Sequence, residues 1–415
     1  MKPQNHHTLP DGWEMKRLGE VIAELESGSS LNSFDRKIQH GEIGILKVSA
    51  VSGCKFTPSE HKTILPKESH LARINPRKDS IIISRSNTPE LVGHSAYIHQ
   101  DHPNLYLPDK LWQTVLRKGA EVNSMWLSQS LASEEMLRRI STIATGSSNS
   151  MKNISKEKFL KFEICFPPLA EQKQIAAVLG TWDRAIEQSA ELLKTLRIRH
   201  RGLMYRLLTG QVRLPGYVGE WRHIEINEIA REVSIRNRHD LPLKVLSCTK
   251  YDGLVDSLSY FGRKIYSDDL TTYKIVSKGQ FAYATNHIEE GSIGYQSRYE
   301  AALISPMYTV FSTDSSVEDT YLYYLLKTDR YIQEYRRNMV GSIDRRGGLR
   351  WGDFSKIVVS LPTVDEQRAI ANVLDASLRE IRQHEAKLEA LREQKRGLMQ
   401  CLLTGQVRVP TEATA

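Results

Sequence analysis

The sequence predicts an α+β protein with two similar mixed α/β units, joined by two long helices that pack as an antiparallel coiled coil with a pseudo-twofold internal repeat. Three observations predict this fold. One helix-like segment occurs twice, the apolar residues of both copies follow a heptad pattern, and a region with short strand patterns precedes each copy. A chain of 415 residues is also long enough for more than one core.

The duplication is clearest in the two helix candidates, which end in RGLMYRLLTGQVRLP (201–215) and RGLMQCLLTGQVRVP (396–410). Glu171 aligns with Glu366 without a gap, and 366 − 171 gives an offset of 195. From position 171 to 215, 24 of 45 residues match the residue 195 positions later. Such self-similarity indicates an internal duplication. Toward the N-terminus the offset changes, and a value of 208 pairs Trp13 with Trp221.

Both helix candidates have boundary signals. Thr363 stands three residues before Glu366, the spacing of a capping box, and Pro168 at the corresponding place suits a first helical turn. Gly210 and Gly405 follow the last periodic residues, where a left-handed residue commonly ends a helix. Each helix would hold nearly forty residues and extend about 57 Å at 1.5 Å per residue.

Apolar residues in both copies step by three and four, which predicts a seam between two helices. His200 and Lys395 interrupt this seam at matching places, and a polar seam residue can fix register or orientation at a cost in stability. A simpler interpretation is that the helices serve only stability, but their length exceeds the usual three to four turns and favours a spacer or an assembly platform. The predicted seam consists of Ile186, Leu193, Leu196, Leu203, Leu207, Ile381, Leu388, Leu391, Leu398 and Leu402.

The predicted boundaries are 1–165 for the first unit, 166–213 for the central helix, 214–360 for the second unit, and 361–415 for the C-terminal helix and tail. In the first unit, apolar and β-branched runs predict strands at 43–51, 80–86 and 111–116, followed by a helix at 124–140. In the second unit, they predict strands within 274–285 and 305–313, followed by a helix at 318–337.

Two loops in each unit carry residue types that contact nucleic acids. The first pair, 85–97 and 285–298, offers side chains that read base edges and phosphates, while the second pair, 145–155 and 340–354, suits phosphate contact. An ordinary solvated loop is the alternative interpretation for each residue taken singly. The candidate DNA-binding residues are Arg85, Ser86, Asn87, His94, Ser147, Asn149, Lys152, Asn286, His287, Tyr295, Arg298, Ser342, Arg345, Arg346 and Arg350.

Composition limits the class of protein. The 57 Lys and Arg exceed the 49 Asp and Glu and give a net charge of +8, which makes a polyanionic partner plausible. The four cysteines are far apart, so we expect reduced, buried thiols and neither a zinc site nor a disulfide framework. The sequence has no apolar signal core and no run of about 18 apolar residues, so we expect a cytoplasmic protein.

The motifs favour a binding protein over an enzyme. FPPL at Phe166 lacks the residues that flank Pro-Pro in DNA amine methyltransferases, and the sequence has no G-x-x-x-x-G-K-[ST], HExxH or G-x-S-x-G motif. Paired charges such as Glu171 with Lys173 are expected on the solvated face of a helix. We therefore predict neither catalytic residues nor metal ligands.

Several segments together resemble the DNA specificity subunit of type I restriction-modification systems. They are PPLAEQKQIAAVL (167–179), LPTVDEQRAIANVL (361–374), the two LLTGQVR endings and the LPDGWEMKRLGEVI start (9–22). The resemblance covers essentially the whole chain. Some relatives carry tandem short repeats in the central helix, whereas this sequence has a single SAEL at Ser189, so adjustment of the helix by repeat number is not supported.

The resemblance implies that each variable unit is a target-recognition domain that reads one half of a bipartite double-stranded DNA sequence. It implies that the paired helices set the unread spacer and dock two copies of the modification subunit, which brings S-adenosylmethionine and methylates adenine. Restriction subunits, which use ATP and Mg, would join this complex. The chain itself would be a non-catalytic specificity subunit that binds no cofactor.

Two other functions remain open. One is a helical scaffold that organises partner subunits and binds no DNA, which a DNA-binding assay at varied salt would distinguish. The other is a fused enzyme with its own nuclease or methyltransferase activity, which incubation of the chain with DNA, Mg²⁺ and S-adenosylmethionine would test.

Overall fold

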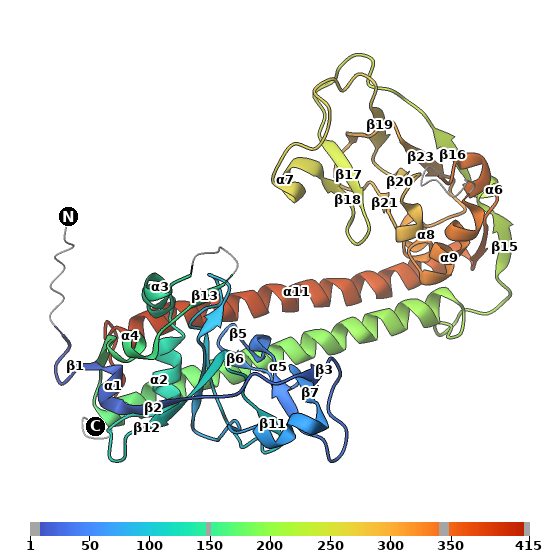
Figure 1. Ribbon diagram of the computed structural model, residues 1–415. Helices are drawn as coiled ribbons and strands as arrows, with labels where there is room; N and C mark the ends of the chain where they lie inside the picture. The colour runs from blue at the N-terminus through green and yellow to red at the C-terminus, as the bar shows by residue number, and fades with distance from the viewer. Residues whose placement is uncertain (1–8, 147–150, 340–347, 411–415) are drawn as a thin grey trace. The chain divides into compact units, whose positions relative to one another are not determined.

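The computed structural model describes residues 9–146, 151–339 and 348–410. The chain divides into two compact units, of which the first contains Met1–Ser189 and Lys387–Ala415 and the second contains Ala190–Ala386 (Figure 1). Because both long helices run from one unit into the other, each unit is described with its own part of each helix.

The main sheet of the first unit has four antiparallel strands in the order β10-β8-β12-β2. Its central strand β8 is buried on both faces, which explains the continuous apolar run IIIS. Because side chains alternate along a strand, Ile81 and Ile83 enter one core while Ile82 enters another. The bounds are β2 (Ile22–Ser27), β8 (Ile81–Ser84), β10 (Ser95–Tyr97) and β12 (Leu111–Leu116).

A second, mixed sheet has the order β11-β4-β7-β3, with β11 parallel to β4. Its strands are β3 (Ser33–Phe34), β4 (Gly44–Leu46), β7 (His61–Ile64) and β11 (Leu105–Tyr106). Three two-stranded ribbons complete the strands of this unit. They are β1 (Glu14–Arg17) with β14 (Glu163–Phe166), β5 (Val51–Ser52) with β6 (Lys55–Phe56), and β9 (Ser86–Asn87) with β13 (Lys152–Asn153).

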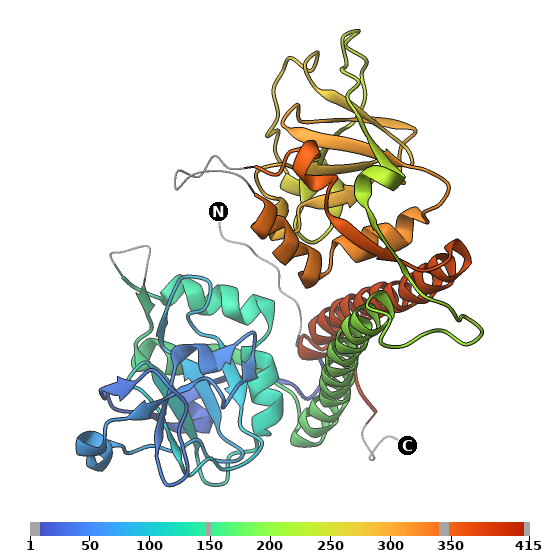
Figure 2. The ribbon, with the colours of Figure 1, turned by 90° about the vertical axis from the view of Figure 1, so that its right-hand side faces the viewer.

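The helices of the first unit cover one face of its main sheet (Figure 2). Trp126 and Leu127 pack into a core that also contains Leu179 from one long helix and Leu402 from the other. This core anchors the variable part of the unit to the long helices. The helices are α1 (Leu18–Val21), α2 (Ser124–Leu131), α3 (Glu134–Ile143), α4 (Lys156–Leu160), the long α5 (Leu169–Leu208) and α11 (Val364–Leu403), and the 3₁₀ turns η1 (Val48–Ala50) and η2 (Pro66–Leu71).

The second unit repeats this plan with a main antiparallel sheet in the order β16-β23-β20-β21, a mixed sheet in the order β18-β17-β22-β19, and a ribbon of β15 with β24. The strands are β15 (Arg222–Glu225), β16 (Ala230–Val233), β17 (Val245–Thr249), β18 (Gly253–Asp256), β19 (Lys274–Ser277), β20 (Phe281–Ala284), β21 (Ile293–Tyr295), β22 (Ala301–Ile304), β23 (Tyr308–Thr313) and β24 (Val358–Leu361). The helices are α6 (Ile226–Ile229), α7 (Ser257–Phe261), η3 (Ile288–Glu290), α8 (Asp319–Leu326), α9 (Asp329–Asn338) and α10 (Trp351–Phe354).

The two units have the same topology, which confirms the predicted fold class. The main-sheet order β10-β8-β12-β2 corresponds strand for strand to β21-β20-β23-β16. The difference lies at the edge of the mixed sheet, where β3 extends the first unit beside β7 and β19 extends the second beside β22. The variable units therefore share a framework and differ in the loops that it carries.

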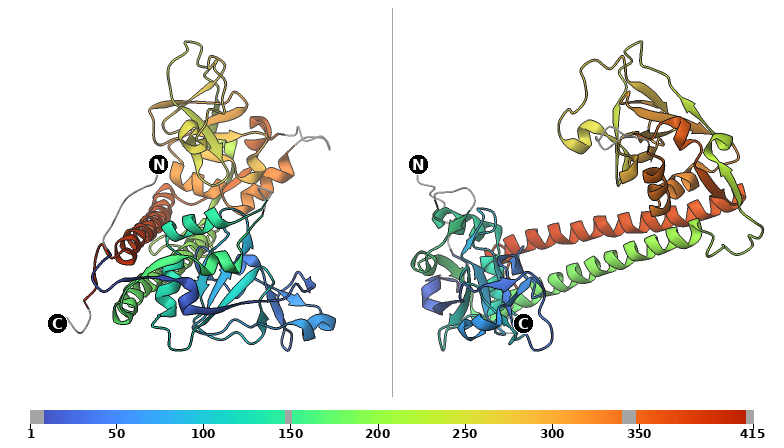
Figure 3. Two further views of the ribbon diagram at one scale, coloured as in Figure 1. Left: turned by 60° about the vertical axis from the view of Figure 1, so that its left-hand side comes forward. Right: turned by 45° about the vertical axis from the view of Figure 1, so that its right-hand side comes forward.

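The long helices pack in antiparallel fashion within each unit (Figure 3). In the first unit, Ile175 and Leu179 near the start of α5 share a core with Leu402 near the end of α11. In the second unit, Leu207 near the end of α5 shares a core with Ile370 and Leu374 near the start of α11. Ion pairs flank the packing, and Lys395 Nζ lies 2.5 Å from Asp183 Oδ1 in the first unit.

Two predicted elements are broken in the structure. The predicted strand 43–51 consists of β4, η1 and the start of β5. The predicted helix 124–140 is two helices, because the Ser133 hydroxyl accepts a hydrogen bond from Met136 N and so begins α3 as a new helix. The predicted helix 318–337 is likewise divided into α8 and α9.

The ends of the long helices agree with prediction at one end only. Gly210 and Gly405 have φ of +70° and +72°, the left-handed conformation expected after a helix. The prediction of a capping box between Thr363 and Glu366 was wrong, since the Glu366 carboxylate accepts two hydrogen bonds from Arg213 instead. The four cysteines are free as expected, but they are half-buried and not fully buried.

Candidate nucleic-acid interface

The structure brings the two predicted loops of the first unit together. β9, in the loop after β8, pairs with β13 in the loop after α3, and Asn87 lies opposite Lys152. Ile154 N also donates to Arg85 O at 2.9 Å. Two segments more than sixty residues apart thus form one ribbon at the end of the central strand. A ribbon fixed by backbone hydrogen bonds can present side chains to a ligand with little loss of freedom on binding.

The same two loops meet in the second unit. Leu349 N donates to Thr285 O at 3.0 Å, which joins the segment before α10 to the loop after β20. The approach is close, because a Cβ on Gly348 would lie 2.9 Å from Asn286 Oδ1. Both units therefore place the corresponding loops side by side at the same end of the corresponding strand.

In the first unit, much of the hydrogen-bonding capacity of the predicted residues holds the loop itself. Arg85 Nε donates to Asp109 O at 2.7 Å, and Asn87 Oδ1 accepts from Thr88 N at 2.9 Å. Ser86 is 3% exposed, so its hydroxyl is covered in the free chain. Lys152 is half-buried, and its Nζ donates to Gly146 O at 2.9 Å. These side chains define the loop shape and leave part of each surface open.

His94 connects the loop to a turn of another ribbon, since its Nδ1 accepts a hydrogen bond from Gly53 N at 3.3 Å. Burial lowers the pKa of the His94 imidazole, so the neutral ring is favoured. A neutral ring can accept this hydrogen bond, whereas an imidazolium cannot. His94 therefore acts first as a positioning group within the loop.

The predicted residues of the second unit fall into two groups. Asn286, His287 and Arg350 lie where the two loops meet, and the last two are exposed. Arg298 is exposed but lies beyond the other end of β21, because Phe281 pairs with Tyr295 and the strands are antiparallel. The structure therefore does not bring Arg298 together with the other candidates.

Tyr295 has a structural partner within its own unit. Its hydroxyl donates to Asp319 Oδ2 at 3.1 Å, and its ring centroid lies 5.0 Å from that of Phe281. Burial, with the nearby Asp319 carboxylate, raises the pKa of Tyr295 to about 12. The remaining predicted residues, Ser147, Asn149, Ser342, Arg345 and Arg346, lie outside the residues that the structure describes.

The predicted seam residues all lie on buried or half-buried parts of the long helices. Leu193, Leu196, Leu207, Ile381, Leu388 and Leu402 are buried, and Ile186, Leu203, Leu391 and Leu398 are half-buried. His200 is buried as well, with its ring 6.4 Å from that of Tyr324, whose hydroxyl bonds to Asp375 at 2.6 Å. Lys395 instead keeps its charge paired with Asp183.

Replacing His200 by leucine is expected to stabilise the second unit more at pH 5 than at pH 8. Burial lowers the pKa of His200, so the unfolded chain takes up a proton below about pH 6.5 while the folded chain resists it. The unchanged protein should therefore lose stability as the pH falls below about 6.5. This contribution to the loss should be absent in His200→Leu. Thermal unfolding across this pH range checks the expectation, and an equal gain at both pH values would contradict it. The exposed His239→Leu is the control.

The sequence interpretation missed a pair of buried ion pairs. Glu171 was expected on a solvated helix face, but it is 1% exposed, and Arg408 donates to both of its carboxylate oxygens at 2.6 and 2.8 Å. Trp13 Nε1 donates to the same carboxylate at 3.1 Å. These donors satisfy the buried charge of the carboxylate. Glu171 therefore joins Trp13 and Arg408 to the start of α5 and is not a surface residue.

The second unit contains the corresponding arrangement. Glu366 is fully buried, and Arg213 donates to its two oxygens at 2.5 and 2.6 Å. The Arg213 guanidinium lies 5.7 Å from the ring centroid of Trp221, and Arg408 lies 6.0 Å from that of Trp13. The repeated Glu, Arg and Trp in matching contexts were the sequence signal for these two sites.

The glutamine after each buried glutamate ties its unit to a long helix. Gln172 Oε1 accepts from Asn123 N at 2.8 Å, and its Nε2 donates to Pro167 O at 2.9 Å. In the second unit, Gln367 Oε1 accepts from Glu318 N and its Nε2 donates to Pro362 O, both at 2.9 Å. The repeated Glu-Gln pair thus has one structural task in each unit, which is to fix the start of a long helix to the helix that follows the main sheet.

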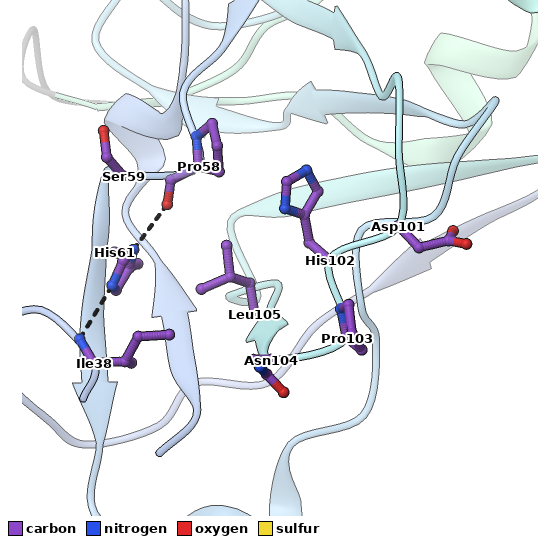
Figure 4. A pocket seen from close by; sticks show the side chains of 9 residues that line it. All are labelled: Ile38, Pro58, Ser59, His61, Asp101, His102, Pro103, Asn104 and Leu105. Atoms are coloured by element: carbon purple, nitrogen blue, oxygen red, sulfur yellow. Dashed lines mark hydrogen bonds between the residues drawn. The ribbon is translucent and has the colours of Figure 1, made fainter. Parts of the chain in front are cut away.

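One hollow of about 360 Å³ lies on the mixed sheet of the first unit (Figure 4). His61 lines it, but its Nδ1 lies 2.8 Å from Pro58 O and its Nε2 accepts from Ile38 N at 3.2 Å. Burial lowers the pKa of His102 on the opposite side. With both ring nitrogens of His61 engaged by backbone groups, this residue is not available for proton transfer.

Among the described residues, His287, Glu289 and Glu290 form a group whose potential ligand atoms lie within 4.8 Å of one another. His287 and Glu290 are exposed, and solvated acidic groups commonly occur together without an ion. We assign no metal to this group, and the expectation of no metal ligands stays a prediction. Within residues 9–146, 151–339 and 348–410, every helix is too short or too polar to span a lipid bilayer.

Comparisons with known proteins give a consistent result. The family described as type I restriction modification DNA specificity domain matches residues 10–197. The MjaVIII type I restriction enzyme specificity subunit of Methanocaldococcus jannaschii is 22% identical over 97% of this chain and 94% of its own length. The S subunit of a type I system from M. genitalium has a similar fold, with a TM-score of 0.58, 15% identity, and coverage of 97% of this chain and 98% of that chain. A second solved structure, from work on assembly of a type I R-M system, covers 97% of this chain and 100% of its own, at 15% identity and a TM-score of 0.56.

Proposed function

We propose that this chain is the sequence-specific DNA-binding subunit of a type I restriction-modification complex, with each unit reading one half of a bipartite target. The match of residues 10–197 to the family described as type I restriction modification DNA specificity domain supports this proposal. One observation carries the proposal. Both units have the same framework and place the same two loops together, while the residues in those loops differ. Equal frameworks with unlike loops are what two readers of unlike half-sites require.

The chemistry of the loops supports a nucleic-acid ligand. In the second unit, His287 and Arg350 are exposed, and the loops that carry them are joined by a backbone hydrogen bond. In the first unit, Lys152 and Asn87 lie opposite each other in a ribbon. Lysine and arginine contact phosphates, while amide and imidazole groups can hydrogen-bond base edges. The net charge of +8 is of the sign that attracts DNA.

The long helices support the proposal that they dock two copies of one partner, the modification subunit. Packing explains matching residues on the buried face, but it does not explain matching residues that face solvent. Exposed identical residues at the offset of 195 suit two copies of a partner that recognise the same surface twice. They are Arg184 and Arg379, Gln188 and Gln383, and Arg201 and Arg396.

In this proposal the chain supplies recognition and its partners supply chemistry. S-adenosylmethionine belongs to the modification subunits, and ATP and Mg belong to the restriction subunits. The paired helices set the unread spacer between half-sites. The alternative of a helical scaffold that binds no DNA predicts assembly with partners but no salt-dependent binding of specific DNA.

Replacing Lys152 or Arg350 by alanine in the assembled complex is expected to weaken binding to all DNA sequences. Each lost phosphate contact should reduce the slope of log affinity against log salt by about 0.9. Arg298→Ala is the matched control, because Arg298 is exposed but lies at the other end of β21. His287→Ala should instead change the preferred base at one position. Binding that does not depend on salt, or is equal for all DNA sequences, would favour the scaffold.

A further inference from the structure

The turn between β17 and β18 projects an aromatic ring from a rigid base. Thr249 pairs with Gly253 across the turn, and Gly253 has φ of +65°, a conformation that glycine adopts without strain. A Cβ on Gly253 would lie 2.7 Å from Tyr323 Oη, so the turn packs closely on α8. At its tip, the Tyr251 side chain is 78% exposed.

Hydrogen bonds from a half-buried lysine fix the position of this turn. Lys327, which caps the C-terminus of α8, donates to Lys250 O at 2.6 Å and to Gly291 O at 2.9 Å. Lys327 is half-buried, and burial lowers the pKa of its ammonium group. At the tip, Lys250 Nζ lies 5.3 Å from the ring centroid of Tyr251. Tyr251 is therefore presented by a backbone that is ordered before any ligand arrives.

The turn lies beside the loop that the proposed function assigns to DNA. Gly291 belongs to the segment that follows Asn286 and His287, and a Cβ on Gly291 would lie 3.7 Å from Lys250 O. Gly253 is also close to this segment, since its Cβ would lie 3.4 Å from Gly294 Cα. β18 and β21, which contain these two glycines, are neighbours (Figure 1). The turn that carries Tyr251 thus packs against the loop that contains Asn286 and His287.

The first unit has a corresponding turn with different side chains. Between β5 and β6, Cys54 Sγ donates to Ala132 O at 3.7 Å, at the C-terminus of α2, and Gly53 N donates to His94 in the predicted DNA-binding loop. The tip of this turn consists of Gly53 and Cys54, so it carries no aromatic ring. A partner shared by both units would meet the same surface twice, whereas Tyr251 occurs in one unit only.

We propose that Tyr251 is a base-contacting residue of the second unit, which packs its ring against a base of that unit's DNA half-site. The inference rests on the proposed function and adds a third recognition element to it. The tip of the turn offers little attraction to phosphate, because the positive charge of Lys250 is offset by the negative charge of Asp252. The Asp252 carboxylate also accepts a hydrogen bond from Tyr260 Oη at 3.1 Å. An aromatic ring instead offers apolar contact to a base edge, such as a thymine methyl group in the major groove.

Tyr251→Ala in the assembled complex is expected to bind the selected DNA target about tenfold more weakly, the equivalent of 1.4 kcal/mol. Base preference should relax at one position of a single half-site, and the salt slope should not change because no charge is lost. Tyr251→Phe keeps the ring and should keep both affinity and preference. Tyr205→Ala removes another exposed tyrosine, from α5, and is the control.

The outcomes separate this inference from the proposed function. If Tyr251→Ala binds like the unchanged chain while Arg350→Ala binds more weakly, the Tyr251 inference is wrong and the proposed function stands. The inference is also wrong if Tyr251→Ala loses assembly with the modification subunit but keeps base preference. If the unchanged complex shows no DNA binding, both proposals fall. Equal thermal unfolding of the variants verifies that they fold.

Discussion

Arg213→Met is expected to destabilise the second unit by about 3–5 kcal/mol, because it leaves the buried Glu366 carboxylate without its charged partner. Glu366 is fully buried, and the Arg213 side chain is 27% exposed. If one partner is removed, water can therefore solvate a remaining Arg213 charge more easily than a remaining Glu366 charge. Glu366→Gln should cost less than Arg213→Met, and the double variant should recover part of the loss.

Hydrogen exchange and thermal unfolding together check this prediction. Faster exchange in Arg213→Met should be concentrated in the segments next to the ion pair, at 211–224 and 362–370. Arg201→Met, which replaces an exposed arginine of α5 in the same unit, is the matched control. Arg408→Met should cost less than Arg213→Met, because Arg408 is 42% exposed and Trp13 still donates to Glu171. A loss below about 1 kcal/mol in Arg213→Met would contradict the structural role of this pair.

Lengthening both long helices by one heptad is expected to change the preferred DNA spacer by about three base pairs. Repeating residues 187–193 after Leu193 and residues 382–388 after Leu388 preserves the seam, since both leucines are buried seam residues. Seven residues add about 10 Å at 1.5 Å per residue, and base pairs are about 3.4 Å apart. Affinity for the original target should fall by about 10³-fold or more, toward non-specific binding.

Selection from a DNA library with randomised spacer lengths measures this shift. The control inserts the heptad into α5 alone, which mismatches the two seams and should reduce stability without a defined new spacer. If the doubly lengthened protein folds and keeps the original spacer, the helices do not act as a ruler.

The sequence predicted the framework because its signals are periodic and repeated. Heptads place Leu193 and Leu388 on an apolar face whatever the surroundings are, and glycines at 210 and 405 follow from the left-handed backbone that ends a helix. The loop pairs were also found, because the first loop of each unit follows a strand pattern and the second follows a helix pattern. Which side chains in them are accessible, such as the covered Ser86 and the exposed His287, depends on contacts that periodicity does not describe.

The burial of Glu171 could not be predicted from the sequence pattern of the helix that contains it. The partner of its carboxylate, Arg408, lies 237 residues away in the chain, and a helical pattern treats a charged residue as solvated. The breaks at Ser133 and after α8 were missed for a related reason. At Ser133 a hydroxyl that caps a new helix interrupts the backbone without changing the apolar pattern on either side. At the second break Thr328 makes no side-chain cap, and its hydroxyl donates to Leu325 O instead.

The central claim is that the two units read separate half-sites, and selection of bound DNA from a fully randomised library by the assembled complex tests it most directly. The unchanged complex should select two short motifs separated by a constant unspecified gap. His287→Ala should then alter one motif and leave the other as it was. A single uninterrupted motif, or a change in both motifs from this one substitution, would contradict the claim.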